Sequence, residues 1–329
     1  MSRYVIGIDQ GTTGTFVGLM NELGNFVAEG YQPHQQIHPQ TGWIEHDPME
    51  LWGNIVTLVN SVIQQSQVTC TQIAGLGIAN QGESVVMWDA ETSKSLYNAI
   101  VWQDTRTASA LMPLMQDERI LQSIRTRTGL HLDAYFSASK IQWLLQKVPE
   151  VGDCLHKGTL RCGTLDTWFM WMLSGGQVYR SDPSTASRTL LYNIHTLTWD
   201  DELLQLFNLP EELMPEVLPT TAHFGEVRHT DLLCQGVPII ASIVDQPAAM
   251  VGHACLDAGQ IKATYGTGCF INMNTGEQSI SSDRGLLTML AWMRDGKITY
   301  GLDGGVLTAG TTINWLCDKL HLVDLPEEI

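Results

Sequence analysis

Two stretches of the chain share one pattern of hydrophobic and polar positions. Residues 4–20 open with an apolar run that ends on Asp9, turn through Gly11-Thr12-Thr13, and return as a second apolar run. Residues 261–273 do the same around Gly266-Thr267-Gly268. Two apolar runs joined by a short glycine turn are typical of a β-hairpin. The repetition predicts two related α/β units, each opening on a hairpin with a Gly/Thr tip.

The pattern elsewhere alternates strands with helices. Asp47 is placed to cap a helix that starts at Pro48, and Glu50 to complete a capping box. We expect one complete α/β domain, residues 1–250, built on a mixed five-stranded sheet, and part of a second, residues 251–329. The remaining periodic segments are helices at 137–147, 167–173 and 308–320 and strands at 73–79, 85–88, 237–244, 286–292 and 297–302.

The composition of the chain argues against several classes of binding partner. The net charge of −17 argues against nucleic acid or an anionic membrane as the main partner. The longest apolar stretch, near 237–244, is far shorter than the roughly 20 residues of a spanning helix, so no integral membrane segment is expected. The seven cysteines are scattered and form no Cys-x-x-Cys pair. Such a set suits reduced thiols and a cytoplasmic protein.

Asp9 and Asp245 each stand at the end of an apolar strand, next to a loop. A carboxylate in such a place either caps a helix or turn, or takes part in ligand binding or catalysis. Beside Gly/Thr tips, whose N–H groups and hydroxyls can bind phosphate, the pair suggests a division of labour. One carboxylate would hold a metal–phosphate through water, and the other would take the proton of an attacking hydroxyl. A Gly/Thr turn alone is more often only a turn, and the chain has no P-loop motif.

Longer motifs occur along the whole chain, and Tyr135 to Trp143, with Lys140, adds a further signature-like segment. The motifs are Asp9-Gln10-Gly11-Thr12-Thr13, Gly42-Trp43-Ile44-Glu45-His46-Asp47-Pro48, Tyr97-Asn98-Ala99-Ile100-Val101-Trp102-Gln103, Asp166-Thr167-Trp168, Ala186-Ser187-Arg188-Thr189, Asn193-Ile194-His195-Thr196-Leu197, Asp245-Gln246 and Tyr265-Gly266-Thr267-Gly268-Cys269-Phe270. With them the chain resembles the FGGY family of carbohydrate kinases, and within it the glycerol kinases most closely.

The resemblance implies an actin-like (ribonuclease H-like) ATPase fold with a cleft between two domains, and ATP and Mg²⁺ as cofactors. It implies Asp245 as general base and Asp9 as the residue that positions Mg²⁺ through its waters. The residues it implies for the nucleotide are Gly11, Thr12, Thr13, Gly266, Thr267, Gly268, Gly310 and Asn314. Those it implies for the substrate are Gly82, Glu83, Trp102, Tyr135, Asp245 and Gln246.

Three departures from the family pattern bear on function. Glycerol kinases carry an arginine that grips substrate hydroxyls where this chain has Gly82, and another near the first phosphate loop where it has Phe16. We expect Gly82 to leave space, so that glycerol binds more weakly and a longer polyol or a ketose is tolerated, unless Arg106 reaches in and restores the contact. The chain also has no counterpart of the family's adenosine-binding glycine motif, so we expect weak or no ATP turnover from these 329 residues.

Two functions of different classes stay open at this point. The first is ATP-dependent phosphorylation of a polyol or sugar hydroxyl, most directly of glycerol to glycerol 3-phosphate. The second is a truncated, non-catalytic chain that binds a polyol or a partner, and exposed apolar surface would favour a homodimer. An actin- or chaperone-type ATPase is disfavoured, because Trp102-Gln103-Asp104-Thr105-Arg106 resembles the substrate cleft of the small-molecule kinases.

Overall fold

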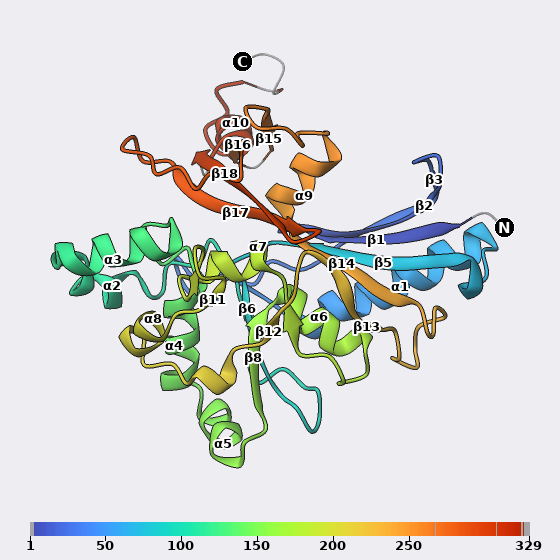
Figure 1. Ribbon diagram of the computed structural model, residues 1–329, viewed down its shortest axis with the longest axis horizontal. Coiled ribbons are helices and arrows are strands. Elements are labelled where there is room, and N and C mark those ends of the chain that lie inside the picture. The colour runs from blue at the N-terminus through green and yellow to red at the C-terminus, as the bar shows by residue number, and fades with distance from the viewer. Residues whose placement is uncertain (1–2, 267, 307, 324, 326–329) are drawn as a thin grey trace.

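The computed structural model describes residues 3–266, 268–306, 308–323 and 325 (Figure 1). Its largest sheet has six strands in the order β13-β14-β5-β1-β2-β3. Strands β14, β5 and β1 run parallel, and the other neighbours pair antiparallel. The strands are β1 (Tyr4–Gln10), β2 (Gly14–Asn21), β3 (Phe26–Pro33), β5 (Ile73–Asn80), β13 (Thr221–Glu226) and β14 (Pro238–Val244).

The expectation of a five-stranded sheet is wrong: the predicted strand at 85–88 belongs to another sheet, and the two edge strands β3 and β13 were not predicted. No side chain of β3 is fully buried, and only Phe224 of β13 is. Edge strands with so few buried side chains give a weak signal in the sequence.

Helix α1 (Pro48–Ser66) packs on this sheet with Leu51, Ile55 and Val59 fully buried. Asp47 caps it as expected, since its Oδ1 accepts the Met49 N–H at 2.8 Å. The predicted capping box is wrong: Glu50 Oε1 accepts the N–H of Gln35 at 3.1 Å and so ties the helix to the preceding loop.

A second sheet, of four strands in the order β4-β7-β6-β8, lies beside the first with the middle helices around it. Its strands are β4 (Glu45–His46), β6 (Val85–Asp89), β7 (Ala99–Ile100) and β8 (Leu160–Thr164). The helices are α2 (Ala108–Leu111), α3 (Glu118–Thr128), α4 (Ser137–Lys147), α5 (Pro149–Lys157), α6 (Leu165–Leu173), α7 (Pro183–Ala186) and α8 (Asp201–Leu206). Two-residue strands β9 (Arg180–Ser181), β10 (Tyr192–Asn193), β11 (Thr198–Trp199) and β12 (Glu216–Val217) and the 3₁₀ turns η1 (Cys70–Gln72), η2 (Leu114–Gln116), η3 (Ser187–Thr189) and η4 (Glu211–Leu213) complete this part.

The last part of the described chain forms an antiparallel sheet in the order β15-β16-β18-β17. In Figure 1 it lies on the opposite side of the six-stranded sheet from α1 and α6. Hydrogen bonds tie it to the rest: Tyr300 donates to the Ile194 carbonyl at 2.8 Å, and the Met293 N–H donates to Thr220 Oγ1 at 3.0 Å. Its elements are α9 (Asp245–Gly252), β15 (Ile261–Tyr265), β16 (Cys269–Gly276), β17 (Leu287–Arg294), β18 (Lys297–Val306) and α10 (Gly310–Asp318).

No helix among the described residues is both long and apolar enough to cross a membrane.

Candidate active site

The two aspartates singled out in the sequence come to one edge of the six-stranded sheet. Gln10 of β1 and Val244 of β14 both pair with Asn80 of the strand between them. Asp9 and Asp245 therefore end parallel strands on either side of β5, where the carboxyl ends of parallel strands commonly form ligand sites. Both residues border one hollow on the open face of the sheet, called here the sheet hollow.

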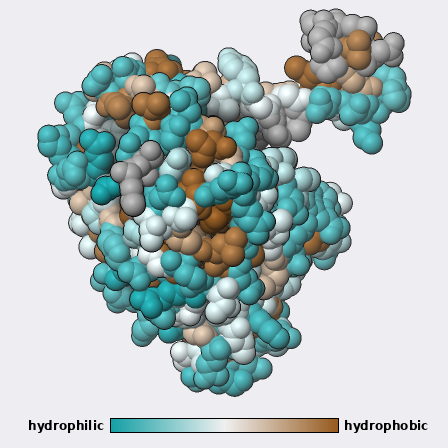
Figure 2. Space-filling model, turned by 90° about the vertical axis from the view of Figure 1, so that its right-hand side faces the viewer, coloured by the Kyte–Doolittle hydropathy of each residue, from teal (hydrophilic) through white to brown (hydrophobic). Residues whose placement is uncertain are grey.

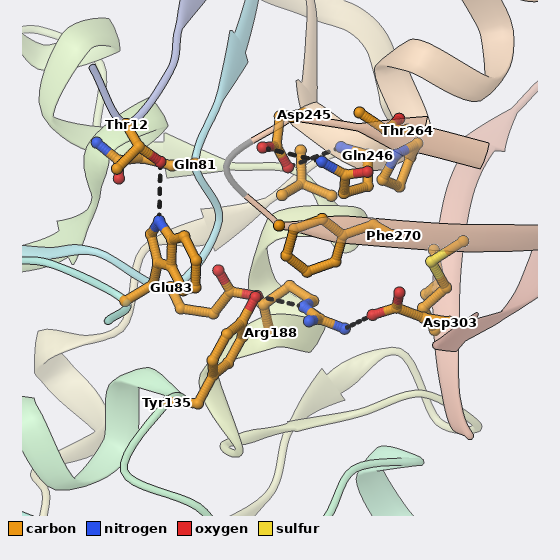
Figure 3. A pocket seen from close by; sticks show the side chains of 17 residues that line it. Thr12, Gln81, Glu83, Tyr135, Arg188, Asp245, Gln246, Thr264, Phe270 and Asp303 are labelled. Atoms are coloured by element: carbon orange, nitrogen blue, oxygen red, sulfur yellow. Dashed lines mark hydrogen bonds and ion pairs between the residues drawn. The ribbon is translucent and has the colours of Figure 1, made fainter. Parts of the chain in front are cut away.

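A cavity of about 140 Å³, the central cavity, lies between this edge and the antiparallel sheet (Figure 3). That volume is about tenfold the roughly 10–15 Å³ that admits one water, so it has room for a small organic molecule. Polar side chains line it from both parts of the chain. They are Thr12, Gln81, Glu83, Tyr135 and Arg188, then Asp245 and Gln246 of α9, and Thr264 and Asp303 of the antiparallel sheet.

Asp245 begins α9, where its Oδ1 accepts the N–H of Gln246 at 2.7 Å. Burial raises the pKa of Asp245 to about 7, and the negative charges of Glu83 and Asp9 act in the same direction. A carboxylate with such a pKa can take up a proton at neutral pH, which is the property that a general base needs.

Asp9 keeps an exposed side chain at the sheet hollow, and partial desolvation there raises its pKa. Phe16 stands opposite it across the β1–β2 pair. No cluster of three or more potential metal ligands occurs within the described ranges. A single accessible carboxylate still fits Mg²⁺, which commonly keeps several waters and binds one or two carboxylates together with phosphate oxygens.

An aromatic wall closes one side of the central cavity. The Trp102 ring lies 5.3 Å from Tyr135 and 6.3 Å from Phe270, centre to centre. Trp102 Nε1 donates to Thr12 Oγ1 at 2.9 Å, so this wall also holds the first Gly/Thr tip. Burial, followed by the charge of Glu83, raises the pKa of Tyr135 well above its usual value, so its hydroxyl stays protonated and can donate.

Glu83 and Asp303 both form ion pairs with Arg188, as Figure 3 shows. Arg188 Nε donates to Glu83 Oε1 at 2.6 Å, and Arg188 Nη1 lies 3.3 Å from Asp303 Oδ2. On the other side Lys262 Nζ donates to Gln246 Oε1 at 2.6 Å. Sequence reasoning assigned no role to Arg188, Asp303 or Lys262, although Arg188 belongs to one of the motifs that carry the resemblance.

The residues expected to bind nucleotide form two tips. The Gly11 N–H donates to the Gly14 carbonyl at 3.0 Å, and the Gly266 N–H donates to the Gly268 carbonyl at 2.9 Å. Gly310, at the start of α10, donates its N–H to the Gly266 carbonyl at 2.9 Å, which joins α10 to the second tip.

Of these residues Thr12, Gly266 and Gly268 line the central cavity. Thr13 is exposed at the first tip, and Asn314 is exposed one turn along α10 from Gly310. Thr267 lies outside the described residues. Thr12, Gly266 and Gly268 thus bring both Gly/Thr tips to the same cavity. The assignment of nucleotide-binding residues stays a prediction.

The expectation that Gly82 leaves space is wrong. A Cβ at this position would lie 2.3 Å from Val244 Cγ2 and 3.3 Å from Arg188 Cγ, so neighbouring side chains already fill the place. Gly82 itself is buried beside the cavity without lining it.

The alternative that Arg106 restores the contact is also wrong. Arg106 Nη2 binds Glu45 at 2.7 Å and Asp104 at 2.8 Å, and its guanidinium stacks 3.8 Å above the Trp43 ring, outside the cavity lining.

Comparison with known proteins decides the family. The model of the FGGY family of carbohydrate kinases, N-terminal domain, matches residues 4–252. The chain belongs to the FGGY family of carbohydrate kinases. A "Glycerol kinase" of Bacillus cereus (strain G9842) is 43% identical over 322 residues, which are 98% of this chain and 65% of that protein. The chain thus spans slightly less than two thirds of the length of the relatives that it matches.

The fold of the chain also matches solved structures of kinases. The Plasmodium falciparum glycerol kinase with ADP superposes with a TM-score of 0.92 at 36% identity, over 99% of this chain and 65% of that one. The gluconate kinase of Lactobacillus acidophilus superposes with a TM-score of 0.86 at 23% identity, over 100% of this chain and 65% of that one. The second likeness concerns the fold alone. The predicted actin-like α/β fold is confirmed.

Proposed function

We propose that this chain forms the substrate side of an ATP-dependent kinase that phosphorylates a small polyol, with glycerol, converted to glycerol 3-phosphate, as the leading candidate. The observation that carries the proposal is Asp245, a carboxylate with a pKa near 7 in the wall of a cavity sized for a small molecule. The glycerol kinases among the relatives support the choice of substrate. On this proposal residues 1–250 form the substrate domain and residues 251–329 begin the nucleotide domain.

On this proposal, each residue that the family resemblance implies has a role that fits its position. Asp245 accepts the proton of the attacking hydroxyl, while Glu83, Tyr135 and Gln246 hold hydroxyl groups from the sides of the cavity and Trp102 packs against carbon. Asp9 would hold Mg²⁺ through water, and the two tips would bind phosphates. When bound, ATP and Mg²⁺ supply the phosphoryl group and the charge that stabilises its transfer.

The first test is binding, because it needs only the residues around the central cavity. Calorimetric titration of the 329-residue chain with glycerol, xylulose and gluconate should give saturable binding of glycerol and weaker binding of the other two. If glycerol does not bind while gluconate does, the proposed substrate class is wrong.

The second test is phosphoryl transfer from ATP to glycerol, measured for the wild type and for Asp245→Asn. Where transfer occurs, loss of a general base should lower its rate by about 10²–10⁴-fold. Asp231→Asn, at an exposed aspartate outside the lining of the central cavity, is the matched control and should leave the rate unchanged. A chain that binds glycerol but transfers no phosphate would favour the non-catalytic, polyol-binding alternative.

A further inference from the structure

Arg188 carries an unused donor in the wall of the central cavity. Its side chain is only 7% exposed, and Nε donates to Glu83. Nη1 lies 3.3 Å from Asp303 Oδ2, yet it makes no hydrogen bond with any residue in the described part of the chain. Nη1 itself is closed off from solvent, so a ligand oxygen in the central cavity would accept from the part of the guanidinium that borders the cavity.

The guanidinium is held in place before any ligand arrives. Glu83 and Asp303 bind it from two sides, and the rings of Tyr135 and Phe136 lie 5.8 and 5.3 Å from its central carbon. Burial works against its charge, but the two carboxylates outweigh burial and raise the pKa of Arg188. A cation fixed in this way loses little freedom on binding, which favours affinity.

Val244 explains why the donor comes from position 188 rather than from position 82. Its Cγ2 stands where a side chain at position 82 would begin, 2.3 Å from the place of a Cβ on Gly82. The stem of Arg188 contacts the same place, with Cγ at 3.3 Å. Gly82 is therefore a close-packing glycine, and Val244 takes the volume that Gly82 was expected to leave empty.

We propose that Arg188 is the residue that grips a substrate hydroxyl in this chain, and that Val244, packed over Gly82, keeps the cavity small. This inference rests on the proposed polyol kinase function and names the specificity of the same site. It reverses the expected tolerance for longer substrates.

The charges around Arg188 define the class of ligand. Glu83, Asp245 and Asp303 all line the cavity, and Arg188 is the cation among its lining residues. A carboxylate or phosphate on the ligand would be repelled by this excess of negative charge. The matching ligand is a short neutral polyol, in which one hydroxyl oxygen accepts from the Arg188 guanidinium and another hydroxyl donates to a carboxylate.

The experiment compares ligands that differ by one hydroxyl. Glycerol, propane-1,2-diol and propane-1,3-diol are titrated calorimetrically into the wild type and Arg188→Lys. Lysine keeps the charge but lacks the fork of donors, so glycerol should bind about ten- to a hundredfold more weakly. The preference for glycerol over the diol without the gripped hydroxyl should disappear, while the other diol weakens as glycerol does. Arg228→Lys, at an exposed ion pair with Glu226, is the control and should change nothing.

The outcomes separate this inference from the proposed function. If the wild type binds none of the three ligands, the proposed function itself fails. If the wild type binds glycerol and Arg188→Lys binds it equally well, this inference alone is overturned. Equal weakening of all three ligands would also overturn it, because that result marks a merely structural arginine.

A second variant leaves Arg188 in place, which covers the case that Arg188→Lys does not fold. Gly82→Ala should weaken glycerol binding, because its new methyl group displaces Val244 Cγ2 and the stem of Arg188. Gly82→Ala/Val244→Ala removes that methyl clash and should recover much of the affinity. Wild-type affinity in Gly82→Ala, or no recovery in the double variant, would contradict the packing of Val244 against this site.

Discussion

At the scale of residues, the central cavity holds charges that burial makes costly. Burial raises the pKa of Asp245 to about 7 and lowers the pKa of Lys262, which lies beyond Gln246. A purely structural cavity would gain stability from apolar side chains of similar size. Ionisable groups placed in this way are typical of a site that stabilises a ligand or moves a proton.

Asp245 makes stability depend on pH in a definite direction. Its folded pKa of about 7 lies above the roughly 3.9 of an unfolded aspartate, so between these values only the folded chain keeps the proton. The free energy of unfolding should therefore fall as pH rises from about 4 to about 7, and this contribution should then level off. Asp245→Asn should lose less stability over that window and have a higher Tm than the wild type at pH 8.

Thermal unfolding of both chains from pH 4 to pH 8 checks this prediction. The wild type and Asp245→Asn curves should diverge toward high pH, while Asp231→Asn follows the wild type. A residual slope remains in Asp245→Asn, because burial also raises the pKa of Asp182 to about 6. Parallel curves for the wild type and Asp245→Asn would show that Asp245 is not desolvated in solution.

The residues of the site differ in how far the sequence predicts them. Asp9 and Asp245 stand at strand ends, which is a local signal. Glu83, Trp102 and Tyr135 enter only through the resemblance to a family, because nothing local separates them from surface charge or core aromatics. The role of Arg188 depends on Glu83, 105 residues away, and on Asp303 in another sheet, so only the folded chain brings the three together.

At the scale of elements, local chemistry predicts helix starts better than sheet edges. Asp47 was predicted to cap α1 and does so, since this interaction needs only its own side chain and an N–H two residues later. Glu50 had two possible partners, the cap backbone and the loop before the helix, and it binds Gln35 of that loop. Strands β3 and β13 were missed because both lie at sheet edges and have at most one fully buried side chain.

The two side chains at the start of α1 predict different effects. Asp47→Ala should lower the free energy of unfolding by about 1 kcal/mol, because a helix N–H loses its acceptor. Glu50→Ala should lower it by less, since the Gln35 N–H is near the surface and water can replace the carboxylate. Urea unfolding of each variant measures the difference. A larger loss for Glu50→Ala than for Asp47→Ala would show that the loop contact, and not the cap, holds this end of the helix.

At the scale of the whole molecule, both predicted hairpins form, and their tips meet at one cavity. Each hairpin opens a sheet, and Thr12 of one tip and Gly266 and Gly268 of the other line the same cavity. The number of strands and the filling of the cavity could not be predicted, because they depend on contacts between distant segments. The contact between Gly82 and Val244 is of this kind: a glycine in a sequence does not tell whether its neighbours leave space or occupy it.

The open face of the six-stranded sheet carries exposed hydrophobic residues. Figure 2 shows hydrophobic residues gathered in a recess near the middle of the view. The sheet hollow, of about 590 Å³, has mostly apolar walls from β1, β2, β3, β5, β14 and α9. Val5, Phe26 and Ile240 in its lining stay 39%, 49% and 36% exposed. Exposed apolar side chains that lie together in one hollow favour contact with another apolar surface.

We predict that the 329-residue chain self-associates through this face, by contact with a second copy. Sedimentation velocity at rising protein concentration should show a monomer giving way to a dimer. Ile240→Lys places a charge within the hollow and should shift that transition to at least about tenfold higher concentration, because burying an unpaired ammonium opposes association. Leu155→Lys changes a side chain of equal exposure, 36%, on α5 and is the matched control. A chain that stays monomeric at all concentrations would contradict the prediction, and equal shifts in both variants would place the contact elsewhere.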